Sequence, residues 1–189
     1  MLTQSKIEQY CKNGFLVIDG VFSQAEVETL REAAESPAIR KALEKSNIAE
    51  RTVHLLNITT FHPAFLKLAK DRRIVDLLVG LIGPDIQLNH SKLATKPSNK
   101  GAGHFDWHQD FAYFPHTNTD LCAVIVMLDD ATPDNGCMNV VRDSHKLGLL
   151  NHMVEGWFSG ACEEPERWSE ESRIVRLTPK AGGISSITA

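Results

Sequence analysis

The apolar pattern of this chain changes near residue 85, from the spacing of helices to the short runs of strands. Before that point, Ser23 and Glu26 form an S-x-x-E capping box at the start of a helix. Residues 63–82 carry apolar side chains at mixed three- and four-residue spacing, with an expected break near Asp71. These features predict a first part of the chain that is mainly helical.

Strand-like runs are short and lie mostly in the second part of the chain. Residues 15–18 (FLVI) are one such run near the start, and residues 121–128, 137–141 and 174–177 are later ones. Helices followed by strands are typical of an α+β or mainly β domain, in which helices cover one face of a sheet.

The length and composition fit one globular domain. The chain has 189 residues, of which 42% are hydrophobic and 23% are charged. We expect residues 1–84 to form a helical cover with one short strand, and residues 85–189 to form the strand-rich part.

The net charge and the length of the apolar stretches argue against several kinds of partner. The net charge is −4 with no run of like charges, so nothing favours a nucleic acid or an anionic membrane. No apolar stretch approaches the roughly 20 residues that cross a bilayer, and the first residues lack the basic and apolar parts of a secretory signal. The four cysteines form no C-x-x-C pair, which excludes a zinc ribbon and predicts a reduced, cytoplasmic protein.

Residues 103–111 place two histidines and two aspartates close together. In an extended strand the side chains of residues i and i+2 lie on one face, so His108 and Asp110 would project together, as would His104 and Asp106. One imidazole and one carboxylate can occupy adjacent positions of an octahedral metal ion, and a second histidine from a distant strand would complete a facial triad. The tripeptide alone also fits a surface strand, but the aromatic residues around it favour the wall of a site.

Several short motifs follow in a fixed order. They are Trp107-His108-Gln109-Asp110-Phe111, then Tyr113-Phe114-Pro115, Asn135-Gly136-Cys137 and Ser144-His145-Lys146. Together with Asn13-Gly14-Phe15-Leu16-Val17-Ile18 near the start, their order and spacing resemble the phytanoyl-CoA dioxygenase family over nearly the whole chain.

This resemblance implies a fold and an activity. The fold is a double-stranded β-helix (jelly roll) with an N-terminal helical layer. The activity is hydroxylation of a small organic substrate, with Fe(II) as cofactor and 2-oxoglutarate and O₂ as co-substrates. His108 and Asp110 would be iron ligands. Related halogenases carry a small residue in the position of Asp110, so an aspartate there indicates hydroxylation.

The end of the sequence departs from the family pattern. The family takes its third ligand from a later histidine, and a following arginine binds 2-oxoglutarate. Residues 179–185 resemble the turn before that histidine, but no histidine follows His152 and no arginine follows Arg176. We therefore expect a jelly roll truncated before its last strands. A fragment, a truncated gene product and a non-catalytic jelly-roll binding protein remain as alternatives, and a cupin-like metal protein is disfavoured because cupins use more histidine ligands.

Further residues are candidates for lining the site. Lys92 would lie in the 2-oxoglutarate pocket or be a solvated strand lysine, and Gln109 would contribute to the cofactor pocket or fix its strand. His104, Trp107, Tyr113 and His145 are expected to contact the metal ligands or the substrate. Trp157 and Phe158 would form a lid over the site or ordinary core.

Overall fold

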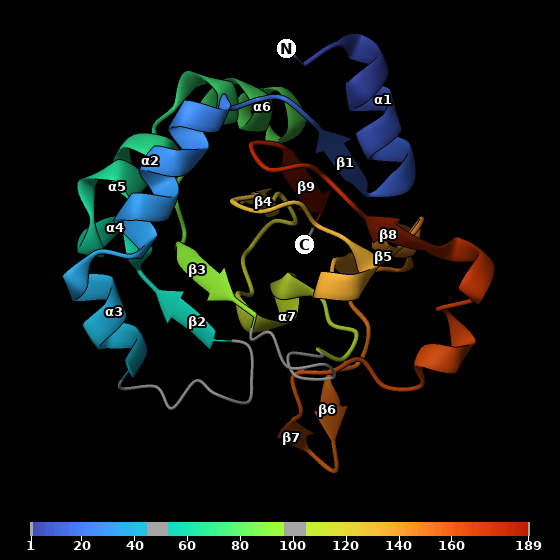
Figure 1. Cartoon of the computed structure of the whole chain (residues 1–189). Coiled ribbons are helices and arrows are strands. Elements are labelled where there is room, and N and C mark those ends of the chain that lie inside the picture. The colour runs from blue at the N-terminus through green and yellow to red at the C-terminus, as the bar shows by residue number, and fades with distance from the viewer. Residues whose placement is uncertain (1, 45–52, 97–104, 189) are drawn as a thin grey trace.

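The structure is a computed structural model that describes residues 2–44, 53–96 and 105–188 (Figure 1). The α-helices are α1 (Gln4–Asn13), α2 (Gln24–Ala34), α3 (Pro37–Glu44), α4 (Ile58–Phe61), α5 (Pro63–Ala69), α6 (Arg72–Ile82) and α7 (Asp110–Tyr113). The strands are β1 (Phe15–Ile18), β2 (Val53–Leu56), β3 (Lys92–Thr95), β4 (Cys122–Val126), β5 (Met138–Val141), β6 (Met153–Val154), β7 (Trp157–Phe158), β8 (Ile174–Leu177) and β9 (Ile184–Thr188).

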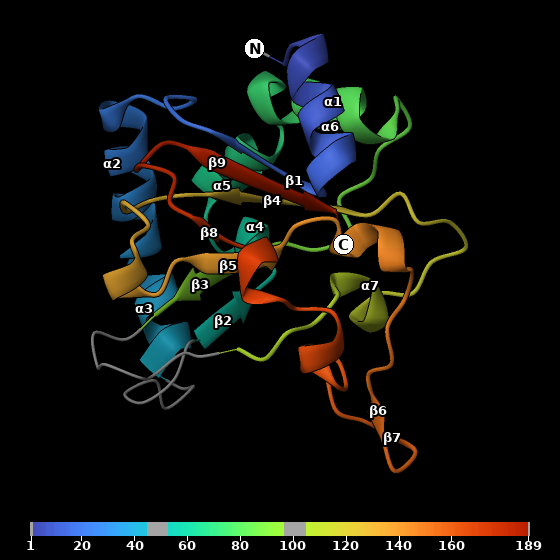
Figure 2. The same ribbon diagram turned by 90° about the vertical axis from the view of Figure 1, so that its right-hand side faces the viewer.

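A three-stranded antiparallel sheet joins the two ends of the chain. Its order is β1-β9-β4, so the last strand lies between an early strand and a middle one (Figure 2). Phe15 pairs with Ile187, and Cys122 pairs with Thr188. Ser185 and Ser186 of β9 are almost completely buried, as expected for a central strand.

Two apolar clusters attach the helices to the strands. In the first, Tyr10 of α1 and Leu77 of α6 pack with Leu16 and Ile184 against one face of the three-stranded sheet. In the second, buried residues of α2, α3, α4 and α5 pack against Leu55 and Leu93 of the β2–β3 pair. The helices therefore cover the strands from one side. No helix within the described residues is long and apolar enough to cross a membrane.

The remaining strands form separate pairs. β2 pairs with β3 and β5 pairs with β8, both antiparallel. β6 and β7 form a small hairpin that extends away from the rest of the molecule in both views (Figures 1 and 2). Trp157 on this hairpin is 79% exposed, so it is neither core nor, in this conformation, a closed lid.

Several local predictions are confirmed. Ser23 and Glu26 form the complete capping box of α2. The helical stretch over 63–82 is broken where expected, because the Asp71 side chain accepts from the Arg73 backbone N–H and caps α6. The strands predicted near residues 15, 122, 138 and 174 are also present.

The expectation of one short strand before residue 84 is wrong. Val53–Leu56 is a second strand, and it pairs with β3 through registers such as His54 with Ala94. The sequence V-H-L-L carries no alternation and no turn signal, so its strand conformation depends on a partner about forty residues away. The helix α3 (Pro37–Glu44) is a further element that the sequence analysis does not predict, and Pro37 is its first residue, a position where proline is well tolerated.

Gly182 lies in the turn before β9, where the backbone leaves no room for a side chain. Gly182 has φ +80°, donates to Met127 O at 2.8 Å and accepts from Phe22 N at 2.9 Å, and an added Cβ would collide with the Phe22 carbonyl. Gly20 has a similar φ of +68° but open space around it. We expect Gly20→Ala to cost about 1–2 kcal/mol from backbone strain and Gly182→Ala roughly 3 kcal/mol or more, because the clash adds to the strain. Urea unfolding of both variants measures the difference, and equal losses would contradict the close backbone approach.

Candidate metal site

The segment that carries His108 and Asp110 is extended but is not a strand. Residues 105–109 join no ladder among the described strands, and Asp110 is the first residue of the short helix α7. The predicted strand is therefore wrong. His108 and Asp110 still project to the same side, because Gln109 between them has φ −114° and ψ 129°, the dihedrals of an extended residue.

His108 and Asp110 converge. Their nearest atoms, Nε2 and Oδ1, lie 3.7 Å apart. The Nδ1 of His108 lies 2.9 Å from the backbone oxygen of Asp106, and because a carbonyl only accepts, Nδ1 carries the proton. The lone pair of Nε2 is therefore free on the side of the carboxylate. Both side chains are partly open to solvent, at 36% and 29% exposure.

One face of the β2–β3 pair forms a wall beside these two residues. Lys92 lies opposite Leu56, and His54 lies opposite Ala94, so all four side chains share one face. The His54 ring stacks on Phe105 with centroids 5.1 Å apart, and Phe105 in turn contacts the His108 ring at 6.4 Å. This stack connects the wall to the metal-ligand candidates.

The charges on this wall act on one another. Burial, followed by the positive charge of Lys92, lowers the pKa of His54, and the same two causes in the same order lower the pKa of His90. Both imidazoles are therefore neutral at neutral pH. The negative charge of Asp110 acts on the pKa of both rings in the opposite direction and offsets part of this lowering. This carboxylate therefore lies within electrostatic range of His54 and His90.

Tyr113 closes another side of the site. Its hydroxyl donates to Gly160 O at 2.6 Å, and its ring meets the His108 ring edge-on with centroids 5.9 Å apart. Burial, and then the charge of Asp110, raise the pKa of this phenol, so it stays protonated. Phe158 of β7 packs edge-on against the same ring at 5.0 Å.

Gln109 points away from His108 and Asp110. Its side-chain amide donates to Gly148 O at 2.9 Å and accepts from Leu150 N at 2.8 Å. Both ends of the amide are therefore engaged by one loop, which leaves its role in a cofactor pocket without support from the geometry.

The other predicted residues lie in different surroundings. The Trp107 ring meets Trp168 edge-on at 6.1 Å. His145 packs against Gly14, and its Nε2 donates to Cys11 O at 3.0 Å, so its ring contacts the end of α1. His104 lies outside the described residues.

The structure also brings in residues that the sequence did not single out. His54 and His90 had no recognisable partner pattern, and they reach Asp110 only because β2 pairs with β3 and because His90 stacks on Phe114 at 4.4 Å. No short-range signal predicts contacts of this kind.

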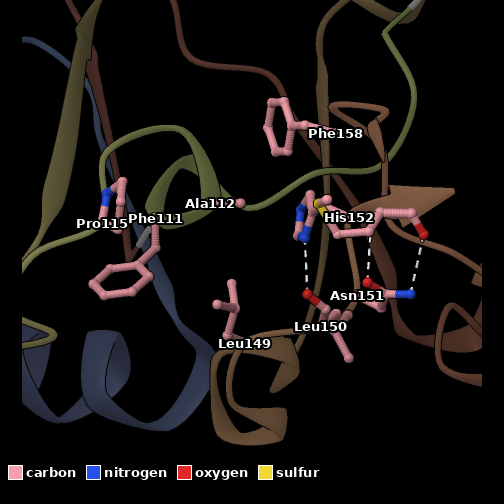
Figure 3. A pocket seen from close by; sticks show the side chains of 9 residues that line it. Phe111, Ala112, Pro115, Leu149, Leu150, Asn151, His152 and Phe158 are labelled. Atoms are coloured by element: carbon pink, nitrogen blue, oxygen red, sulfur yellow. Dashed lines mark hydrogen bonds between the residues drawn. The ribbon is translucent and has the colours of Figure 1, made fainter. Parts of the chain in front are cut away.

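A pocket of about 200 Å³ lies on the side of α7 that faces the loop before β6 (Figure 3). Phe111 and Pro115 lie on one side of it, Leu149 and Leu150 below, and Phe158 above. Its lining is mainly apolar, so it suits an apolar group rather than a metal ion.

The described residues provide two candidate ligands for a metal ion. Across residues 2–44, 53–96 and 105–188, no three side chains of histidine, cysteine, aspartate or glutamate come together to hold a metal ion. His108 and Asp110 thus form a pair of candidate ligands without a third from this part of the chain.

Similar sequences cover most of the chain. The chain is 33% identical over 195 residues to a probable alpha-ketoglutarate-dependent hypophosphite dioxygenase of Stutzerimonas stutzeri, covering 95% of this chain and 67% of the relative. It is 24% identical over 203 residues to an ectoine dioxygenase of Bordetella bronchiseptica, covering 99% of this chain and 64% of the relative. The chain thus spans about two thirds of the length of these relatives.

Solved structures share the fold. EctD from S. alaskensis in its apoform superimposes with a TM-score of 0.79 at 23% identity, covering 98% of this chain and 68% of that one. The same protein with bound Fe gives a TM-score of 0.77 at 22% identity, covering 99% and 68%. The fold is therefore that of the jelly-roll Fe/2-oxoglutarate oxygenases.

The family model described as Phytanoyl-CoA dioxygenase (PhyH) matches residues 10–185. The match includes the capped helix α2 and the His108–Asp110 segment, and it ends within the strand β9. The chain belongs to the phytanoyl-CoA dioxygenase family, whose cofactors are iron and 2-oxoglutarate.

Proposed function

We propose that this chain carries the iron-binding segment of an Fe(II)/2-oxoglutarate-dependent dioxygenase that hydroxylates a small organic substrate. One observation supports the proposal most directly. The Nε2 lone pair of His108 and the carboxylate of Asp110 converge to 3.7 Å, and the proton on Nδ1 is held by Asp106 O. A histidine that donates its other ring nitrogen to a carbonyl is the usual form of a metal-ligating imidazole.

The donor set fits Fe(II). One imidazole nitrogen and one carboxylate oxygen are two of the three ligands of the 2-His-1-carboxylate arrangement. When bound there with 2-oxoglutarate, Fe(II) would supply the activation of O₂ that hydroxylates a C–H bond. His108 and Asp110 would hold the ion, while the rings of Phe105 and Tyr113 beside them would limit access of water to it.

Lys92 is the residue of the wall best suited to attract 2-oxoglutarate. Its ammonium is exposed, forms no ion pair with any described residue, and acts electrostatically on both His54 and His90. Because those two imidazoles are neutral, Lys92 supplies the positive charge of this wall. A dicarboxylate beside Asp110 would otherwise meet repulsion from that carboxylate.

The substrate class follows from relatives rather than from the pocket. Relatives of this chain are named for hypophosphite, ectoine and L-proline, all small polar molecules. A small polar substrate also suits a site whose ligands are partly open to solvent.

A non-catalytic jelly-roll binding protein is the second candidate. The observation in its favour is that the described residues bring together two metal ligands and no third. With two candidate ligands and no third among the described residues, Fe(II) is expected to bind weakly.

Metal binding tests the proposal directly. In an anaerobic titration with Fe(II) and excess 2-oxoglutarate, we expect a weak visible charge-transfer band at high metal concentration. His108→Ala and Asp110→Ala should each reduce metal affinity by about 100-fold or more, since each removes a ligand. His116→Ala, which removes a nearby exposed imidazole, is the matched control. A band that survives both ligand substitutions would refute the assignment, and no band in the unmodified chain would favour the binding protein.

Lys92→Gln separates the co-substrate from the metal. We expect the affinity for 2-oxoglutarate at saturating metal to fall by about tenfold, because an interaction with a charged group is lost, while the affinity for metal alone stays the same. Lys67→Gln, on an exposed position of α5, is the control for charge in general. Equal 2-oxoglutarate affinities for the two variants would remove Lys92 from the pocket.

A further inference from the structure

The segment that carries His108 and Asp110 is held by a loop instead of by neighbouring strands. Residues 105–109 join no ladder of the described chain, so their backbone groups need other partners. Residues 148–162 supply partners for two of them. Cys162 N donates to Trp107 O at 2.7 Å, and Gln109 N donates to the imidazole Nε2 of His152 at 3.0 Å.

His152 is the centre of this support. The residue is 4% exposed, and both of its ring nitrogens are engaged. Nδ1 lies 2.8 Å from Leu150 O, as drawn in Figure 3, and must donate because the carbonyl only accepts. Nε2 is therefore unprotonated and accepts from Gln109 N, with the Cys162 thiol 3.3 Å away as a second donor.

The two hydrogen bonds of His152 have different consequences. The bond from Nδ1 stays inside the loop, since Leu150 is only two residues away. The bond to Nε2 fixes the peptide nitrogen of Gln109, the residue between the two ligands. The Gln109 side chain adds bonds to Gly148 and Leu150 of the same loop. The φ of Gln109, which sets the direction of His108 relative to Asp110, is thus constrained from the His152 side.

We propose that His152 is a positioning residue that fixes the backbone of Gln109 and thereby keeps His108 and Asp110 convergent. The proposal rests on the proposed function only for the identity of the two ligands. His152 itself does not reach the metal, because its Nε2 is already used by Gln109 and Cys162. It replaces the strand neighbour that residues 105–109 lack.

A matched pair of substitutions separates the two hydrogen bonds. His152→Gln places an amide oxygen near the position of Nε2 and keeps the acceptor for Gln109 N, but loses the donor to Leu150. His152→Asn places an amide nitrogen near the position of Nδ1 and keeps the donor to Leu150, but loses the acceptor. His152→Gln gives up one hydrogen bond in this buried place, whereas His152→Asn gives up the bond from Gln109 and the weaker contact with the Cys162 thiol. The thermal unfolding midpoint should therefore fall in both variants, and somewhat further in His152→Asn.

Two measurements without metal test the positioning directly in the full chain. Amide hydrogen exchange of Gln109 should speed up by roughly tenfold in His152→Asn and stay within about threefold of the original chain in His152→Gln. Nitrogen NMR shifts of His108 should show the single Nδ1-protonated tautomer in the original chain and in His152→Gln. In His152→Asn they should show a mixture, because the segment that aligns His108 with Asp106 O is released.

A third measurement, the affinity for a metal ion, tests whether the position of Gln109 affects the two candidate ligands. Co²⁺, used as a spectroscopic probe, should bind about 10–100-fold more weakly to His152→Asn than to His152→Gln. Unchanged Gln109 exchange and His108 tautomer in His152→Asn would overturn the proposal, as would equal damage in both variants. If Co²⁺ binds neither variant nor the original chain, the metal assignment fails, while the exchange and tautomer data still decide the role of His152.

Discussion

The pairing of β9 with β1 on one side and β4 on the other is the interaction on which the rest of the structure depends. It joins residues 15–18 to residues 184–188 and closes one layer of the domain. The helices α1 and α6 pack on the face that this sheet presents, through Leu16, Ile184 and Leu77. Without β9 the strands β1 and β4 would have no common partner in this sheet, and the apolar face that holds these helices would not form.

Local rules account for much of the fold. The capping box at Ser23 and the cap at Asp71 are short-range hydrogen bonds, so the sequence alone placed the ends of those helices. The strand β2 shows the limit of such rules. Its four residues carry no strand pattern, and they are extended because β3 offers them hydrogen-bond partners. A prediction from spacing cannot find an element whose conformation is imposed by a partner distant in sequence.

The candidate site also combines local relations with contacts between distant segments. His108 and Asp110 were found because one extended residue between them is enough to bring them together, and this relation is local. The groups around the candidate site come from separate parts of the chain, namely His54, His90, Lys92 and His152. Only Lys92 among these was singled out, and that was by resemblance to a family. The two candidate ligands could thus be proposed from the sequence, whereas the residues around them are brought in by tertiary contacts.

The end of helix α1 has a consequence for the order of folding. Three backbone carbonyl groups in its last turn and cap bind distant segments, since Cys11 O accepts from His145, Asn13 O accepts from Asp143 N, and Gly14 O accepts from Thr188 N. The carbonyl groups at a helix end have no partner within the helix, so during synthesis they stay hydrated until residues 143–188 are available. The contacts at the end of α1 therefore form only after residues 143–188 have been made. Contacts this far apart in sequence belong to the slow, high-contact-order part of a folding reaction, and the apolar face of α1 must be kept from other partners until then.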